Sequence, residues 1–243
     1  MCKCNELIWH IDQSLKPIVI NGFFMEYDKE EITIQSIKKY INFKKKTVLE
    51  IGCGNGNISS LLADGTENYI GIDPDNNAII KAKSKFSNID FRIGNGESLE
   101  FEDSIFDVVL FTLSLHHQNA SIALKEADRV LTKTGALLII EPSCNGELQQ
   151  FFNLFNDETN KINETFESIM NSCFILKNQD TFNAMAKFNN QAELCTYHFD
   201  RERIGSNDCE RIIKKLQRLQ ISYSDHQPIF LNDKINIYHL KKN

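Results

Sequence analysis

The sequence lacks the features that mark membrane-spanning, secreted and nucleic-acid-binding chains. No stretch of its 243 residues approaches the ~18 consecutive apolar residues of a membrane span. The N-terminal stretch MCKCNELIWH holds no continuous apolar core and no cleavage-site pattern, so we expect no secretory signal. The formal net charge is -6, whereas nucleic-acid binding requires a basic face. We therefore expect neither a membrane nor a nucleic acid as partner.

The seven cysteines are too scattered to form a metal or redox motif. No C-x-x-C pair occurs, and the one close pair is Cys2 and Cys4. Because zinc sites usually need further Cys or His residues at matching spacing, we expect free thiols and no metal site. Free thiols persist in a reducing compartment, which predicts a cytoplasmic protein.

What the sequence does contain is a regular alternation of strands and helices. Strands are predicted at 47–51, 69–73, 89–93, 106–112 and 136–141, and helices at 57–64, 75–86 and 119–132. Continuous apolar strands that alternate with helices indicate a parallel sheet covered on both faces. The prediction is an α/β, doubly wound, Rossmann-like fold, with ligands bound at the carboxyl ends of the strands.

The flanking segments follow a different pattern. Two helices are expected before the first strand, at 5–15 and 29–42, and two more stripes of helical spacing lie within 147–176. A short helix at 181–188, a strand at 193–199, a helix from Ser206 to about Gln220 and a strand at 234–240 complete the expectation. The sheet would be seven-stranded and mostly parallel, with an antiparallel last strand.

One stretch, Thr47–Ser59, combines a strand, three glycines at alternate positions and the start of a helix. Glycines allow sharp turns and close approach of a ligand, and the following helix begins with free N–H groups. A dinucleotide-binding motif is the obvious rival, but Asn57 stands where that motif has its third glycine. Glu50, directly before the loop, would oppose a bound pyrophosphate and favours a cationic or amine-bearing ligand. Asp73, at the end of the next strand, suits two ribose hydroxyls.

Together these residues resemble a class I S-adenosylmethionine-dependent methyltransferase, most closely the small-molecule group of ubiquinone/menaquinone-biosynthesis C-methyltransferases. The matching motifs are EIGCGNG (50–56), GIDPD (71–75), GNGESLEFEDSIFDVV (94–109), LSLHH (113–117) and EADRVLTKTGALLIIEP (126–142). The resemblance covers roughly residues 45–142. It implies one methyltransferase domain over 1–243: an N-terminal helical cap (1–43), a cofactor-binding core (44–142), a helical lid insertion (143–190) and C-terminal strands with a helix (191–243).

The resemblance also implies the site residues. Those expected to contact S-adenosylmethionine are Glu50, Gly52, Cys53, Gly54, Asn55, Gly56, Asp73, Pro74, Asn95, Gly96, Glu97 and Leu113. Asn95 stands where the family usually has Asp, so its contact to adenine would be made without charge. His116 and His117 follow the fourth strand on the acceptor side and are the candidate general bases.

The acceptor is expected to be a small molecule, apolar or aromatic, with Phe23, Phe24 and Tyr27 as candidate pocket residues. The segment TLSLHH lacks the Asn/Asp-Pro-Pro-aromatic tetrad of nucleic-acid amino-methyltransferases. Two other functions stay open at this point: a regulator that binds S-adenosylmethionine without turnover, and an NAD-dependent oxidoreductase. The assembly would be a monomer or a homodimer.

Overall fold

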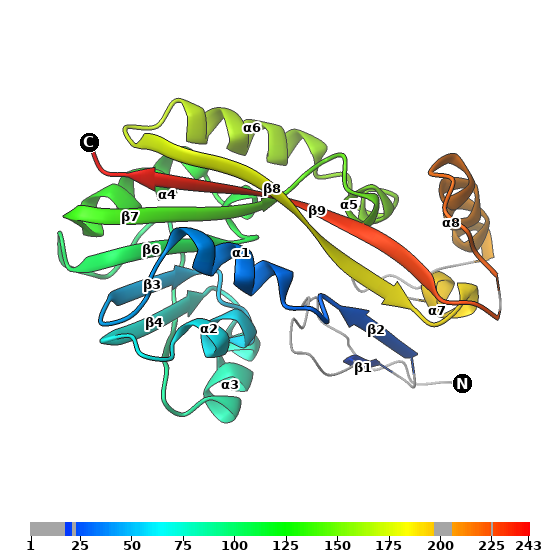
Figure 1. The fold of residues 1–243 in the computed structure, drawn as a ribbon, viewed down its shortest axis with the longest axis horizontal. Coiled ribbons are helices and arrows are strands. Elements are labelled where there is room, and N and C mark those ends of the chain that lie inside the picture. The colour runs from blue at the N-terminus through cyan, green and yellow to red at the C-terminus, as the bar shows by residue number, and fades with distance from the viewer. Residues whose placement is uncertain (1–17, 21–22, 197–205, 225) are drawn as a thin grey trace.

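The computed structural model describes residues 18–20, 23–196, 206–224 and 226–243. Their strands form one sheet in the order β1-β2-β8-β9-β7-β6-β3-β4-β5 (Figure 1). In the described part of the chain, no helix combines the length and apolar character needed to span a membrane.

The parallel part of the sheet matches the sequence prediction closely. It comprises β3 (Thr47–Ile51), β4 (Asn68–Asp73), β5 (Asp90–Ile93), β6 (Phe106–Thr112) and β7 (Leu131–Pro142). Strand β3 pairs in parallel with both β4 and β6, and β6 pairs with β7. Because parallel strands end at one edge of the sheet, the loops after β3, β4 and β6 meet there. The connection reverses from one side of β3 to the other at this point, which creates the crevice for a ligand.

The remaining strands close the sheet with antiparallel pairing. The last strand, β9 (Ile229–Lys241), runs antiparallel between β7 and β8 (Ile175–Phe188), which confirms the predicted antiparallel last strand. The hairpin of β1 (Ile18–Ile20) and β2 (Phe23–Tyr27) then extends the sheet beyond β8. The described sheet therefore has nine strands rather than the predicted seven, because this hairpin adds two strands in a stretch where none was predicted.

Two apolar cores lie on the two faces of the sheet. Helices α1 (Ile32–Tyr40), α2 (Asn57–Leu62), α3 (Asn76–Lys85) and α5 (Glu147–Phe152) contribute to the core that contains Val48 and Leu138. Helices α4 (Ala120–Val130) and α6 (Thr159–Met170) contribute to the core that contains Leu49 and Leu137. Neighbouring strand residues thus face opposite cores, as the pleat requires. Figure 1 shows α4 and α6 apart from α1, α2 and α3.

Two predicted elements of the C-terminal third are wrong. The helix predicted at 181–188 is part of β8, where Ala184, Ala186 and Phe188 are buried and alternate with more exposed residues. Pairing along most of β9 outweighs the local helical pattern.

The strand predicted at 193–199 is instead helix α7 (Gln191–Thr196) up to its last described residue. The side chain of Asn190 accepts from the N–H of Glu193, and the Glu193 carboxylate accepts from the N–H of Asn189, a reciprocal cap that starts the helix. The helix predicted from Ser206 is confirmed as α8 (Ser206–Arg218), whereas the one predicted at 5–15 lies outside the described residues.

The cysteines correct one further expectation. Cys53, Cys144 and Cys173 carry free thiols, as expected. Cys195 is disulfide-bonded, so the expectation is wrong for this residue. The spacing of cysteines along the chain could not reveal it, because the fold decides which thiols meet.

Candidate active site

The glycine loop between β3 and α2 has a backbone that only glycine adopts easily. Gly52, Gly54 and Gly56 have φ values of 82°, 52° and 80°. A Cβ atom on Gly52 would lie 2.1 Å from the Cβ of Ser114, and one on Gly56 would lie 2.5 Å from Cζ of Phe91. The loop is therefore packed against the neighbouring strands with no room for side chains at Gly52 and Gly56. The N–H of Gly52 donates to the carbonyl of Ile72 and that of Gly56 to the carbonyl of Cys53, so the loop is held in this conformation by its own hydrogen bonds.

Asp73 fixes this loop from the adjacent strand. One carboxylate oxygen accepts a hydrogen bond from the N–H of Gly54 at 2.9 Å, and the other accepts from the N–H of Asp75 at 2.9 Å. Both oxygens keep further lone pairs, and the residue lines the crevice. The carboxylate is thus held at the end of β4, where the sequence predicted a partner for two ribose hydroxyls.

Glu50 is a fully buried carboxylate at the base of the crevice. It accepts hydrogen bonds from three hydroxyls, those of Ser59 at 2.5 Å, Tyr69 at 2.9 Å and Thr112 at 2.8 Å. Burial raises the pKa of Glu50, and the three hydroxyls oppose that rise. Among the described residues, its hydrogen-bond partners are all neutral hydroxyls, and no cationic side chain pairs with this carboxylate. A cationic ligand group, such as an ammonium or a sulfonium, fits this position.

These residues line one cavity of about 270 Å³. Its lining residues are Glu50, Gly52, Cys53, Gly54, Asn55, Asn57, Ile58, Asp73, Thr112, Leu113, Ser114, His116, His117, Pro142, Gln149, Phe152, Glu158 and Asp233. The Oδ1 atom of Asn55 is buried without a hydrogen-bond partner among the described residues, which offers a ligand an acceptor. Leu113 has a φ of 53°, a strained conformation of the kind that often marks functional sites. The structure thus gathers nine of the predicted site residues around one space.

The loop after β5 does not reach this cavity. Asn95 uses its side-chain oxygen to accept from the N–H groups of Glu97 and Ser98, and the N–H of Gly96 donates to Gln118. Pro74 is likewise exposed outside the cavity lining. The described contacts of Asn95 are those of a turn, so its predicted contact to adenine stays a prediction. Gly56 also lies outside the lining, where it begins α2.

The three predicted pocket aromatics belong to β2, and Tyr27 lies next to the cavity wall rather than in it. Tyr27 is buried, and its hydroxyl donates to the carboxylate of Asp233 at 2.5 Å. Asp233 in turn lines the cavity, and burial raises its pKa to about 6. Phe23 and Phe24 belong to β2, and their side chains lie outside the described residues.

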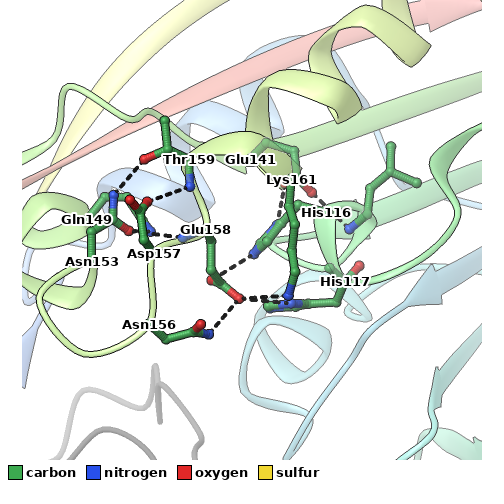
Figure 2. A network of polar contacts seen from close by, with 12 residues as sticks. His116, His117, Glu141, Gln149, Asn153, Asn156, Asp157, Glu158, Thr159 and Lys161 are labelled. Atoms are coloured by element: carbon green, nitrogen blue, oxygen red, sulfur yellow. Dashed lines mark hydrogen bonds and ion pairs between the residues drawn. The ribbon is translucent and has the colours of Figure 1, made fainter.

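The cavity wall across from the glycine loop carries the two predicted histidines. They lie on the 3-10 helix η1 (Leu115–His117), and His116 Nδ1 is 2.5 Å from Oε2 of Glu141 (Figure 2). Burial works to lower the pKa of His116, but the charge and hydrogen bond of Glu141 outweigh it and the pKa is raised. Burial and the neighbouring His116 lower the pKa of His117 to about 4. Glu158 faces both rings from the start of α6.

Sequence reasoning missed several members of this wall. Glu141 ends a predicted strand, and that position was a usable signal, because residues at carboxyl ends of parallel strands face the ligand crevice. Phe152, Glu158 and Asp233 come from segments that carry no motif, and only the folded chain brings them to the cavity. Ser114, whose hydroxyl donates to the carbonyl of Ile51, was hidden next to Leu113.

The strand order with its antiparallel edge, the glycine loop and the acidic residue after β4 define a class I S-adenosylmethionine-dependent methyltransferase. The chain belongs to the methyltransferase domain family. The model of that family matches residues 42–203, which are more than half of the chain. S-adenosylmethionine is the cofactor of this class, and the buried Glu50, the glycine loop and Asp73 fit that molecule.

Similar proteins agree with this assignment. An uncharacterized methyltransferase of Staphylococcus carnosus is 32% identical over 154 residues, which cover 57% of this chain and 73% of the relative. The YcgJ protein of Bacillus subtilis has a similar structure, with a TM-score of 0.64 at 20% identity over 86% of this chain and 97% of YcgJ. A geranyl diphosphate methyltransferase in complex with S-adenosylmethionine gives a TM-score of 0.56 at 10% identity, covering 87% and 84%. Other curated relatives are matched over only 38% to 58% of their own length.

Proposed function

We propose that this methyltransferase transfers the methyl group to a small, apolar or aromatic acceptor that carries one polar head group. The observation that supports the proposal is the cavity that runs from the glycine loop to the histidines. Its surface combines apolar side chains, among them Ile58, Leu113 and Phe152, with polar side chains both beside the glycine loop and beside the histidines. Small-molecule pockets have this composition, in which apolar contacts bind the body and polar groups fix the orientation.

In this proposal the cofactor occupies the side of the cavity formed by β3 and β4. The Asp73 carboxylate would accept from the ribose hydroxyls, and Glu50 would face the ammonium group of the methionine portion. Backbone groups from Gly52 to Gly56 would contact the methionine and ribose portions. Glu50 accepts hydrogen bonds from three hydroxyls and pairs with no cationic side chain among the described residues. This supports placing the ammonium group, rather than the adenine, beside Glu50.

S-adenosylmethionine supplies a methyl group that is already activated on a sulfonium. The protein therefore has to align the acceptor with the S–CH3 bond and to exclude water. Phe152 and Leu113 would exclude water on the apolar side. His116, held by Glu141, and the neighbouring His117 would receive the polar head group and take up its proton if the acceptor has to lose one.

A labelled-methyl screen tests the proposal. The full chain would be incubated with S-adenosylmethionine labelled in its methyl group and with pools of small phenols, enols, thiols and amines. We expect transfer to an organic-soluble product, and a Phe152→Ala variant should raise the KM for that acceptor more than the KM for S-adenosylmethionine. Transfer only to proteins or nucleic acids in a parallel lysate would overturn the small-molecule proposal.

We also propose a cytoplasmic location. The free thiols of Cys53, Cys144 and Cys173 support it, while the disulfide at Cys195 argues in the other direction.

A further inference from the structure

Three side chains with metal-binding atoms converge on the acceptor wall of the cavity. Glu158 lies with Oε2 3.8 Å from Nε2 of His116 and with Oε1 3.6 Å from Nδ1 of His117. One ligand atom from each of the three residues can be chosen so that all lie within 4.8 Å of one another. Figure 2 shows the two imidazole rings and the ammonium of Lys161 on the same side of the Glu158 carboxylate.

The orientation of His116 is fixed from behind. Its Nδ1 contacts Oε2 of Glu141, and the other oxygen of Glu141 accepts from the N–H of Leu115 at 2.9 Å. With Nδ1–H donated to a carboxylate, the lone pair of Nε2 points toward Glu158. A carboxylate that holds the second nitrogen of a histidine is the usual support of a metal-ligating imidazole, because it fixes the tautomer and raises the basicity of the ligand.

We propose that His116, His117 and Glu158 bind one divalent transition-metal ion of the zinc class. In a tetrahedral site with bonds of about 2.0–2.1 Å, neighbouring ligand atoms lie roughly 3.3 Å apart, and the two measured separations exceed this by only a few tenths of an ångström. Two imidazoles and one carboxylate suit zinc, cobalt or iron(II), whereas magnesium and calcium prefer oxygen ligands alone. Three protein ligands leave a fourth position open, which is the pattern of a catalytic rather than a structural site.

Lys161 shows what the cluster attracts. Its ammonium lies 3.5 Å from Oε1 of Glu158, so a cation already faces this carboxylate. The lysine side chain is 55% exposed and can move into solvent when a metal ion replaces it. Asn156, whose amide donates to Glu158 at 3.2 Å, is exposed and would move or reorient in the same way. Lys161 is therefore a competitor of the metal, and its removal should strengthen binding.

The role of the ion follows from the position of its ligands, and this step rests on the proposed function. All three ligands line the cavity that also holds the glycine loop and Asp73. The open position would take an oxygen or sulfur atom of the acceptor. A bound Lewis acid lowers the pKa of such a group and fixes its position. The acceptor class is then a small molecule with a hydroxyl, enol or thiol, whose proton would leave to solvent water when the group binds the ion. Its oxygen or sulfur would form a bond to the methyl carbon while the S–CH3 bond of the cofactor breaks, with the electron pair left on the sulfur of S-adenosylhomocysteine. In this step the two histidines would hold the ion instead of taking the proton directly.

Cobalt(II) titration of the full chain, after treatment with a chelator, tests the site by visible absorption and calorimetry. The wild type should bind one Co²⁺ at this site with the intense visible bands of tetrahedral coordination, and zinc should displace it. Glu158→Gln and His117→Ala should abolish the bands, and Glu141→Gln should weaken binding by ~10–100-fold. Lys161→Met should tighten it, while Glu167→Gln, an exposed change on the same helix, should leave it unchanged.

Binding of S-adenosylhomocysteine is measured on every variant in parallel. Retained binding shows that the variant is folded. It also distinguishes a loss of metal binding from a loss of cofactor binding. Absence of Co²⁺ bands in the wild type would overturn the proposal, as would equal bands in Glu158→Gln. A wild type that binds the metal but transfers no methyl group to hydroxyl, enol or thiol compounds would instead overturn the proposed acceptor and leave the metal site in place.

Discussion

The two walls of the cavity are built in different ways. On one wall, Gly52 and Gly54 present backbone, and Asp73 adds a carboxylate from the next parallel strand. On the other wall, His116 and Glu158 bring titratable side chains from η1 and α6, more than forty residues apart. A cofactor site can thus be made from one short stretch and its neighbouring strand, whereas an acceptor site is assembled by tertiary packing. The first wall, here called the backbone wall, depends on backbone conformation. The second, which includes Asp233 and is here called the polar wall or acceptor wall, depends on buried polar side chains.

The largest expected effect tests the backbone wall. Gly52→Ala should lower the free energy of unfolding by about 2–6 kcal/mol, because backbone strain and overpacking each cost ~1–3 kcal/mol. Both causes apply because Gly52 has a φ of 82° and a new Cβ would lie 2.1 Å from Ser114 Cβ. Urea unfolding followed by circular dichroism gives the measurement.

Gly65→Ala is the matched control for that variant. Gly65 has a φ of 74°, but nothing lies within 4 Å of a Cβ built on it. Strain alone should then cost roughly 1 kcal/mol. Equal losses in the two variants would show that close packing of the loop against Ser114 contributes nothing.

The next effect tests the polar wall. Burial raises the pKa of Asp233 to about 6, so the folded protein holds this proton more tightly than the unfolded chain, whose pKa is near 3.8. The contribution of this group to the free energy of unfolding is therefore fully present below pH 4 and is lost as pH rises through 6. At neutral pH the ionised, buried carboxylate lowers the free energy of unfolding by about 3 kcal/mol relative to low pH. Asp233→Asn should be more stable than the wild type at pH 7.5 by about 2–3 kcal/mol. The difference should shrink between pH 6 and pH 4.

Asp180→Asn serves as the control of opposite sign. Asp180 accepts from Lys39 and Tyr40, and these bonds lower its pKa to about 2. Its contribution is present above the unfolded pKa and lost as pH falls through 2, so the asparagine variant should be slightly less stable at neutral pH. Chemical unfolding at several pH values compares the two. A lower free energy of unfolding in Asp233→Asn than in the wild type at pH 7.5 would contradict the conclusion that the buried Asp233 carboxylate destabilises the folded protein.

Sequence reasoning predicted the backbone wall well because its signals are local. The strand 47–51 has the predicted bounds, and Gly52, Gly54 and Asp73 line the cavity, whereas Gly56 does not. Parallel pairing of β3 with β4 brings the two together without help from distant segments. Asn95 and Glu97 show the limit of the method, because they lie in the predicted loop but make other contacts. The side-chain oxygen of Asn95 accepts from the N–H of Glu97, and the Glu97 carboxylate accepts from the N–H of Asn119.

The polar wall could not be predicted in the same way. Nothing near Glu158 or Asp233 in the sequence distinguishes them from other acidic residues, and their roles depend on how α6 and β9 pack. The same reason explains the error over β8, where pairing with β9 decides the conformation. Local pattern is informative where a site is contiguous, and it fails where long-range pairing supplies the partners.

The most direct test of the division into two walls is calorimetry of S-adenosylhomocysteine binding to the wild type, Asp73→Ala and Glu158→Gln. Loss of the Asp73 carboxylate should weaken binding by ~1.5–3 kcal/mol, a factor of roughly 10 to 150, because a charged hydrogen-bond acceptor disappears from the ribose position. Glu158→Gln should leave the affinity within about twofold of the wild type, since Glu158 belongs to the acceptor wall. Equal affinity of Asp73→Ala and the wild type, or a loss in Glu158→Gln as large as that in Asp73→Ala, would contradict the account.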